Sequence, residues 1–181
     1  MVLLRVQVKF FVENPAALDL PAFVGIFHRW IQQNSVPGLL IDVADYKHVH
    51  EGPGILLIGH EGDYSLDMTG GRPGLLYTRK RKVDATLQDQ LRQAFQLAQT
   101  AVDLIEAETP LRFKKDQAEI RFADRLLIRN EPATLDTLRP DLAAVLSEIY
   151  GDVTPTLSVT STDPREVFTV RVQLSEVLQP Q

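Results

Sequence analysis

Cysteine is absent from all 181 residues of the chain. Without thiols the protein forms no disulfide bond, zinc–thiolate site, iron–sulfur cluster or cysteine nucleophile. No apolar run approaches the ~20 residues that a helix needs to span a bilayer. Charges at Arg5 and Lys9 interrupt the apolar N-terminus, and no small-residue cleavage site follows it, so we expect no signal peptide. These absences predict a soluble, cytoplasmic protein with no membrane partner.

Basic residues are fewer than acidic residues in this chain. The chain has 19 lysine and arginine residues against 24 aspartate and glutamate residues, which gives a net charge of −5. Nucleic-acid binding requires a basic surface, so we expect no nucleic-acid partner. The basic run at 78–82, TRKRK, is interpreted as the solvated end of a strand that precedes a helix.

Alternating and helical patterns of apolar residues define the expected elements. Period-two alternation or short apolar runs between turn residues predict strands at 4–12, 39–42, 55–58, 64–68, 75–78, 120–122, 126–128, 156–161 and 167–174. Apolar stripes spaced by three and four residues predict helices at 19–33, 84–107 and 140–150. The last helix is expected to begin at about Pro140, after a short helical turn that starts at Thr134, because proline inside a helix removes a hydrogen bond.

The order of these elements predicts an α+β fold with a mainly antiparallel sheet and about three helices packed on one face. Apolar residues make up 44% of the chain, enough for one core, so we expect a single domain over 1–181. Each half, 1–82 and 83–181, pairs helices with antiparallel strands. This arrangement suggests a structural pseudo-repeat, although no sequence repeat accompanies it.

Three of the four histidines fall within residues 42–61, DVADYKHVHEGPGILLIGHE. His48 and His50 are two residues apart, so on a strand their side chains would project from the same face. Asp42 would add an oxygen ligand. Imidazoles and carboxylates bind divalent transition metals, so one hypothesis is a metal site made of His48, His50 and Asp42.

Strand geometry argues against including the third histidine in that site. A hairpin closed by Gly52-Pro53-Gly54 would place Asp45 opposite His60, and would turn His60 away from His48 and His50. We therefore prefer a structural Asp45–His60 hydrogen bond, with His48 and His50 at a surface or subunit contact.

An acid–base site is the catalytic alternative for the same segment. Asp45 would orient His60 as a base, with Glu61 as a further acid–base group. Glu61 follows His60 directly, so on a strand their side chains would diverge. No activated serine motif accompanies these groups, so we favour binding over catalysis.

The segment DVADYKHVHEGPGILLIGHE, continuing to GDYSLD and GRPGLLYTRKRK, resembles a family of small bacterial proteins with no assigned activity. The likeness covers about the first eighty residues. The resemblance supplies no catalytic residues that could be assigned to positions of this chain.

We therefore expect a non-enzymatic protein that acts by binding or self-association. An open antiparallel sheet has edges that must be covered or paired, and a homodimer is the commonest solution, so a homodimer is the predicted partner state. A small-molecule ligand is a second expected partner. The alternative is a metal-dependent enzyme that uses the segment around His48, His50 and His60.

Overall fold

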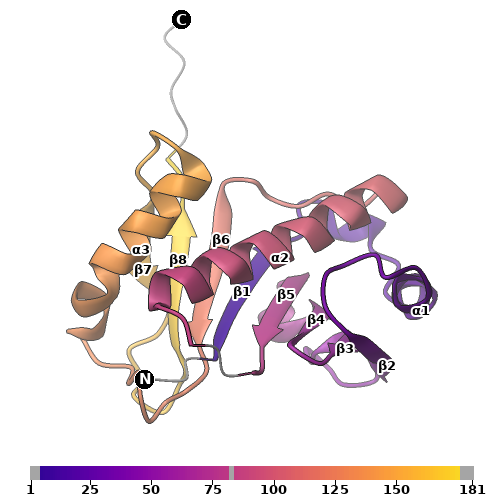
Figure 1. Cartoon of the computed structure of the whole chain (residues 1–181), viewed down its shortest axis with the longest axis horizontal. Helices are drawn as coiled ribbons and strands as arrows, with labels where there is room; N and C mark the ends of the chain where they lie inside the picture. Colours follow the sequence, from indigo (N-terminus) through magenta and orange to yellow (C-terminus); the bar gives the residue numbers. More distant parts are fainter. Residues whose placement is uncertain (1–4, 82–83, 176–181) are drawn as a thin grey trace, which may run out of the picture.

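The computed structural model describes residues 5–81 and 84–175, which form a single sheet with helices against it (Figure 1). The strands in this part of the chain are β1 (Val6–Phe11), β2 (Leu40–Tyr46), β3 (Gly54–Gly59), β4 (Gly62–Asp67), β5 (Gly74–Arg79), β6 (Gln117–Phe122), β7 (Thr156–Val159) and β8 (Phe168–Gln173). The α-helices are α1 (Ala22–Gln33), α2 (Leu87–Glu108) and α3 (Thr134–Tyr150), and the short 3-10 helices are η1 (Pro15–Ala17) and η2 (Thr69–Gly71). The predicted α+β class with an antiparallel sheet is confirmed. Leu4, expected in the first strand, lies outside the described residues.

The strand order is β2-β3-β4-β5-β1-β6-β8-β7, and every neighbouring pair is antiparallel. Strands β2 to β5 form the predicted meander. The first strand of the chain then inserts between β5 and β6. One continuous sheet therefore joins the strands of the two expected halves through the β1–β6 pair.

One face of the sheet carries the apolar core. The cross-strand row Ile120, Val8, Tyr77, Tyr64 and Leu57 runs through β6, β1, β5, β4 and β3, and all five residues are buried. Residues that lie directly opposite each other on neighbouring strands project to the same side. This row therefore marks the face that the helices cover.

The helices cover this face unevenly. Helix α1 packs on β2 and β3, α2 packs on β1 and β5, and α3 packs on α2 (Figure 1). Strand β4 lies between the strands that α1 and α2 cover. The boundary between the two helices therefore runs above β4. None of the helices in the described part of the chain is long and apolar enough to cross a membrane.

The opposite face of the sheet is polar, and none of the three α-helices of the described residues lies on it. Its central row is Arg171, Glu119, Lys9, Leu76 and Ser65, on β8, β6, β1, β5 and β4. The alternation in β1 correctly predicts that Lys9 lies opposite the core side. Its side chain is nevertheless fully buried, at 0% exposure, because it forms an ion pair with a carboxylate on the same face.

Two predicted elements differ from the structure. Residues 126–128 form a turn instead of the return arm of a hairpin, with the amides of Leu127 and Ile128 bonded to the Asp124 carbonyl at 3.2 and 2.9 Å. Both edges of β6 are already paired, with β1 and β8, so a return arm has no edge to join.

Helix α3 begins at Thr134, six residues before the predicted start at Pro140. The helix continues through this proline because buried Leu138 and Leu142 pack into the core on either side of it. Their burial offsets the hydrogen bond that proline cannot donate.

Candidate functional site

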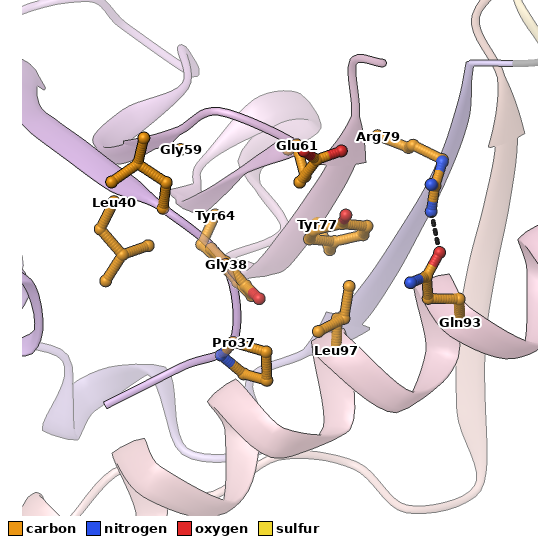
Figure 2. Close-up of a pocket in the computed structure, with 12 residues that line it drawn as sticks. Pro37, Gly38, Leu40, Gly59, Glu61, Tyr64, Tyr77, Arg79, Gln93 and Leu97 are labelled. Atoms are coloured by element: carbon orange, nitrogen blue, oxygen red, sulfur yellow. Dashed lines mark hydrogen bonds between the residues drawn. The ribbon is translucent and has the colours of Figure 1, made fainter. Parts of the chain in front are cut away.

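A cavity of about 180 Å³ lies over β4 at the boundary between α1 and α2 (Figure 2). We call it the Arg79 cavity. Its walls come from the α1–β2 connection, the β3–β4 turn, strands β4 and β5, and one side of α2. A water molecule occupies about 30 Å³ of liquid, so the space corresponds to about six waters. The cavity therefore has room for a ligand of only a few heavy atoms.

Arg79 is the charged group that strand alternation directs to this cavity. It follows Tyr77 by two residues in β5, so both side chains project to the helix-covered face. The residue opposite it on β4 is Gly62, which has no side chain to block the guanidinium. Arg79 is only 4% exposed, although it belongs to the basic run at 78–82.

The guanidinium of Arg79 has few partners. Its Nη1 donates a hydrogen bond to Oε1 of Gln93 on α2, shown in Figure 2. Its Nε is buried and has no hydrogen-bond partner, and no carboxylate among the described residues forms an ion pair with it. Burying a charge is costly unless the charge is paired, and Arg79 has no direct ion-pair partner here, because the Glu61 carboxylate that lines the same cavity does not contact it.

Two tyrosines add hydroxyl groups to the cavity, Tyr77 on the side of Arg79 and Tyr64 farther from it, toward Leu97 (Figure 2). Tyr64 on β4 and Tyr77 on β5 lie directly opposite each other, with ring centroids 5.1 Å apart. The Tyr64 hydroxyl is buried and has no partner among the described residues. The Tyr77 hydroxyl lies over Gly62, where an added Cβ atom would stand 2.5 Å from it.

The environment keeps both tyrosines protonated. Burial raises the pKa of Tyr64, and the nearby Tyr77 raises it further. Burial also raises the pKa of Tyr77, although the Arg79 charge acts in the opposite direction. At neutral pH both hydroxyls are therefore hydrogen-bond donors, and both residues line the same cavity as Arg79.

A fixed turn forms the rim of the cavity. The His60 amide donates to the Leu39 carbonyl at 2.7 Å, and the Lys80 amide donates to the Glu61 carbonyl at 2.9 Å. These bonds tie the turn to the α1–β2 connection on one side and to the end of β5 on the other. The Glu61 side chain lines the cavity but stays half exposed.

The predicted catalytic residues do not form the expected arrangement. Asp45 lies opposite Ile55, so the predicted Asp45–His60 pair is wrong. The hairpin connection covers 47–53 instead of the three-residue turn, and this length changes the register. The Asp45 carboxylate instead binds Lys47, at 2.5 Å from its Nζ, and this hydrogen bond lowers the pKa of Asp45.

The predicted divergence of His60 and Glu61 is also wrong. The two residues lie in a turn between β3 and β4 rather than on a strand, so alternation does not separate them. Their Nε2 and Oε1 atoms are 3.8 Å apart. Glu61 is the only one of the six predicted site residues that lines the Arg79 cavity.

The proposed metal ligands are not gathered into one site. His48 and His50 lie in the exposed 47–53 connection, where the His50 side chain is 94% exposed. Asp42 lies on β2, and its carboxylate accepts a hydrogen bond from the Val43 amide at 2.7 Å. Within residues 5–81 and 84–175, no three histidine, aspartate or glutamate side chains are placed to hold a metal ion.

The sequence interpretation missed Arg79, Tyr64 and Tyr77 as site residues. The basic run was assigned to solvent as a whole, because its composition suggests a solvated surface. A signal was present in the alternation of Leu75, Tyr77 and Arg79, which places the arginine on the apolar side of β5.

Comparisons of this chain with protein-family models, with curated proteins and with solved structures found no match.

Proposed function

We propose that this chain is a non-catalytic protein that binds a small monocarboxylate in the Arg79 cavity. The observation that carries the proposal is the buried Arg79 guanidinium, which faces the cavity without a carboxylate partner. An anionic ligand would supply the missing counterion. Arginine suits this role because its N–H groups match the two oxygens of a carboxylate.

The size and lining of the cavity favour an organic acid with a short apolar tail. The polar side has one buried cation, two hydroxyl donors and the half-exposed Glu61 carboxylate at the rim, so the buried part of the cavity fits at most a single negative charge. Leu40 and Leu97 line the same cavity and offer apolar contact to a tail. A volume of about 180 Å³ is well below the ~300 Å³ at which pockets for larger ligands begin.

Binding is favoured over catalysis because of the protonation state of the tyrosines. Groups with raised pKa values hold their protons at neutral pH, so Tyr64 and Tyr77 act as donors and not as bases. The expected cytoplasmic location remains part of the proposal, since small organic acids are abundant solutes of that compartment.

Propionate provides the first test. At constant ionic strength, propionate is expected to raise the thermal unfolding temperature of the protein, because a ligand that binds only the folded state stabilises it. Neutral propionamide, which has nearly the same shape, is expected to have no effect. Arg79→Gln is expected to weaken propionate binding about 10- to 100-fold, the effect of losing one charge-assisted hydrogen bond.

Arg139→Gln is the matched control, since Arg139 is an exposed residue of α3 that forms an ion pair with Asp136. This variant loses the same charge and should bind propionate as the wild type does. If Arg79→Gln does not fold, Tyr64→Phe replaces it, with an expected loss of about 2- to 10-fold in affinity. Equal effects of propionate and propionamide, or unchanged propionate affinity in both cavity variants, would overturn the proposal.

A further inference from the structure

A second hollow, of about 530 Å³, lies on the face of the sheet opposite the α-helices. We call it the open-face hollow. Its floor is formed by β1, β6 and β8, where Lys9, Glu119 and Arg171 occupy one cross-strand row. Residues of η2 and of the β7–β8 connection stand at its two ends. It is separated from the Arg79 cavity by the thickness of the sheet.

Lys9 and Asp67 form a buried ion pair beneath this hollow. Their Nζ and Oδ2 atoms are 2.7 Å apart, and both residues are buried. The lysine side chain reaches Asp67 by crossing Gly74 on β5, where an added Cβ atom would stand 2.7 Å from the lysine Cε. The Thr69 hydroxyl donates to the other oxygen of Asp67 at 2.7 Å. This pair leaves no net charge.

Three arginines share the remaining carboxylate of the floor. The Glu119 carboxylate lies 3.2 Å from Arg72, 3.4 Å from Arg121 and 3.0 Å from Arg171. Arg121 is also 3.8 Å from Asp67. One glutamate therefore faces three guanidinium groups, and the floor carries an excess of two positive charges. Glu166 at the rim offsets only part of this excess.

The guanidinium groups are held in place and retain unused donors. Arg72 stacks on the Phe11 ring, with its Cζ atom 3.9 Å from the ring centroid. The Nε of Arg171 is buried and has no hydrogen-bond partner among the described residues. Burial and the positive charge of Arg171 lower the pKa of Arg72, as expected where like charges are crowded. Additional negative charge would relieve this repulsion.

We infer that the open-face hollow binds the phosphoryl group of a small phosphorylated molecule through Arg72, Arg121 and Arg171. Three guanidinium groups outnumber the Glu119 and Glu166 carboxylates of the hollow, so its lining attracts an oxyanion, and arginine pairs bind phosphate oxygens in a fixed geometry. The volume lies within the ~300–1,000 Å³ of metabolite pockets, which favours a phosphate monoester over free phosphate. This inference is independent of the carboxylate site.

Calorimetric titration at constant ionic strength tests the inference, with phenyl phosphate, inorganic phosphate and chloride as the probes. Phenyl phosphate is expected to bind more tightly than inorganic phosphate, and chloride is expected not to compete. Arg171→Gln is expected to weaken phenyl phosphate binding about tenfold or more, because a charge-assisted hydrogen bond to the phosphoryl group is lost. Arg171 is half exposed, so this variant should fold, and Arg72→Gln provides an independent second variant.

Two control variants show whether phenyl phosphate binds in this hollow or elsewhere on the protein. Arg139→Gln removes an exposed charge of α3 and should leave phenyl phosphate binding unchanged. Arg79→Gln should also leave phenyl phosphate binding unchanged, and Arg171→Gln should leave propionate binding unchanged.

Binding of phosphate alone, with no gain in affinity from the phenyl group, would indicate a free-phosphate site and overturn the monoester assignment. Equal weakening by Arg171→Gln and Arg139→Gln, or loss of binding only in Arg79→Gln, would overturn the site itself.

Discussion

At the scale of single residues, the Tyr64 hydroxyl is the group whose environment is easiest to test. It is buried on β4 and has no partner among the described residues. A buried polar group without a partner costs about 1–3 kcal/mol relative to a satisfied one. A ligand that accepts a hydrogen bond from this hydroxyl would recover that cost, which links the stability of the ligand-free protein to the proposed function.

Tyr64→Phe is therefore expected to raise the free energy of unfolding of the ligand-free protein by about 1 kcal/mol. Denaturant titration measures this change. Tyr46→Phe on β2 is the matched control, because Tyr46 is exposed and loses the same hydroxyl at little cost. A lower free energy of unfolding in Tyr64→Phe would mean that the hydroxyl is satisfied, and would remove one donor from the proposed site.

The pH dependence of the stability of Tyr64→Phe is a second test of the environment of this hydroxyl. The pKa of Tyr64 is raised in the folded protein, so the folded state keeps a proton that the unfolded state loses above about pH 10. The stability contributed by this group is complete below that pH and is lost as the pH rises further. Between about pH 8 and about pH 10.5, Tyr64→Phe is expected to lose less stability than the wild type.

Single-residue placements were only partly predictable from the sequence. The alternation in β1 gives the correct side for Lys9, but its complete burial depends on Asp67, which is distant in the chain. The position of Arg79 depends on where β5 ends and on the fact that α2 covers that end. Alternation gives the side of a strand on which a residue lies, whereas burial is decided by the element packed above it.

At the scale of elements, the β4–β5 pair shows why a glycine is needed beside the cavity. Gly62 lies opposite Arg79, and a Cβ atom there would stand 2.5 Å from the Tyr77 hydroxyl and 2.7 Å from the Thr78 carbonyl oxygen. Both contacts are shorter than van der Waals packing allows. Any side chain at this position must displace the tyrosine or the neighbouring strand.

Gly62→Ala is expected to lower the free energy of unfolding by about 1–3 kcal/mol through overpacking, and to abolish propionate binding. Gly25→Ala on α1 is the comparison, because a Cβ atom there meets nothing within 4 Å. A helix-interior alanine should raise the free energy of unfolding by about 0.5–1 kcal/mol. Urea denaturation of both variants measures the difference, and similar stability changes in the two would contradict the described packing.

Elements were more predictable than their ends and connections. The apolar patterns correctly indicated the meander, the long helix α2 and the final hairpin of β7 and β8. Helix α3 begins earlier than predicted because packing of Leu138 outweighs the disruption by Pro140. The β2–β3 register could not be predicted, since it depends on an irregular connection in which Glu51 adopts a left-handed conformation with φ of 47°.

At the scale of the whole molecule, the order of the strands in the sheet explains why the sequence alone did not predict either proposed site. Tyr64 and Tyr77 are neighbours only because β4 and β5 pair, and Arg171 meets Glu119 only because β8 pairs with β6. Each site also needs groups from segments far apart in the chain. Three histidines lie close together in the sequence. Two of them, His48 and His50, lie in an exposed connection and point to solvent, so they form no site with His60.

The edges of the sheet bear on the predicted homodimer. Strand β2 forms one edge, and near it Leu39 and Ile41 are exposed apolar residues. Strand β7 forms the other edge and is short, which is one way in which proteins limit edge pairing. The homodimer remains a prediction, and the β2 edge is the surface on which we expect it.

The most direct measurement of the central claim is the Nε–H NMR signal of Arg79 during a propionate titration, with the signal assigned by its absence from Arg79→Lys. A carboxylate bound beside the guanidinium should move this signal saturably, with the midpoint set by the dissociation constant, while the Arg139 signal stays fixed. A stationary Arg79 signal at propionate concentrations that raise the unfolding temperature would show that the acid binds elsewhere. Proportional movement of all arginine signals would show that it binds without a site.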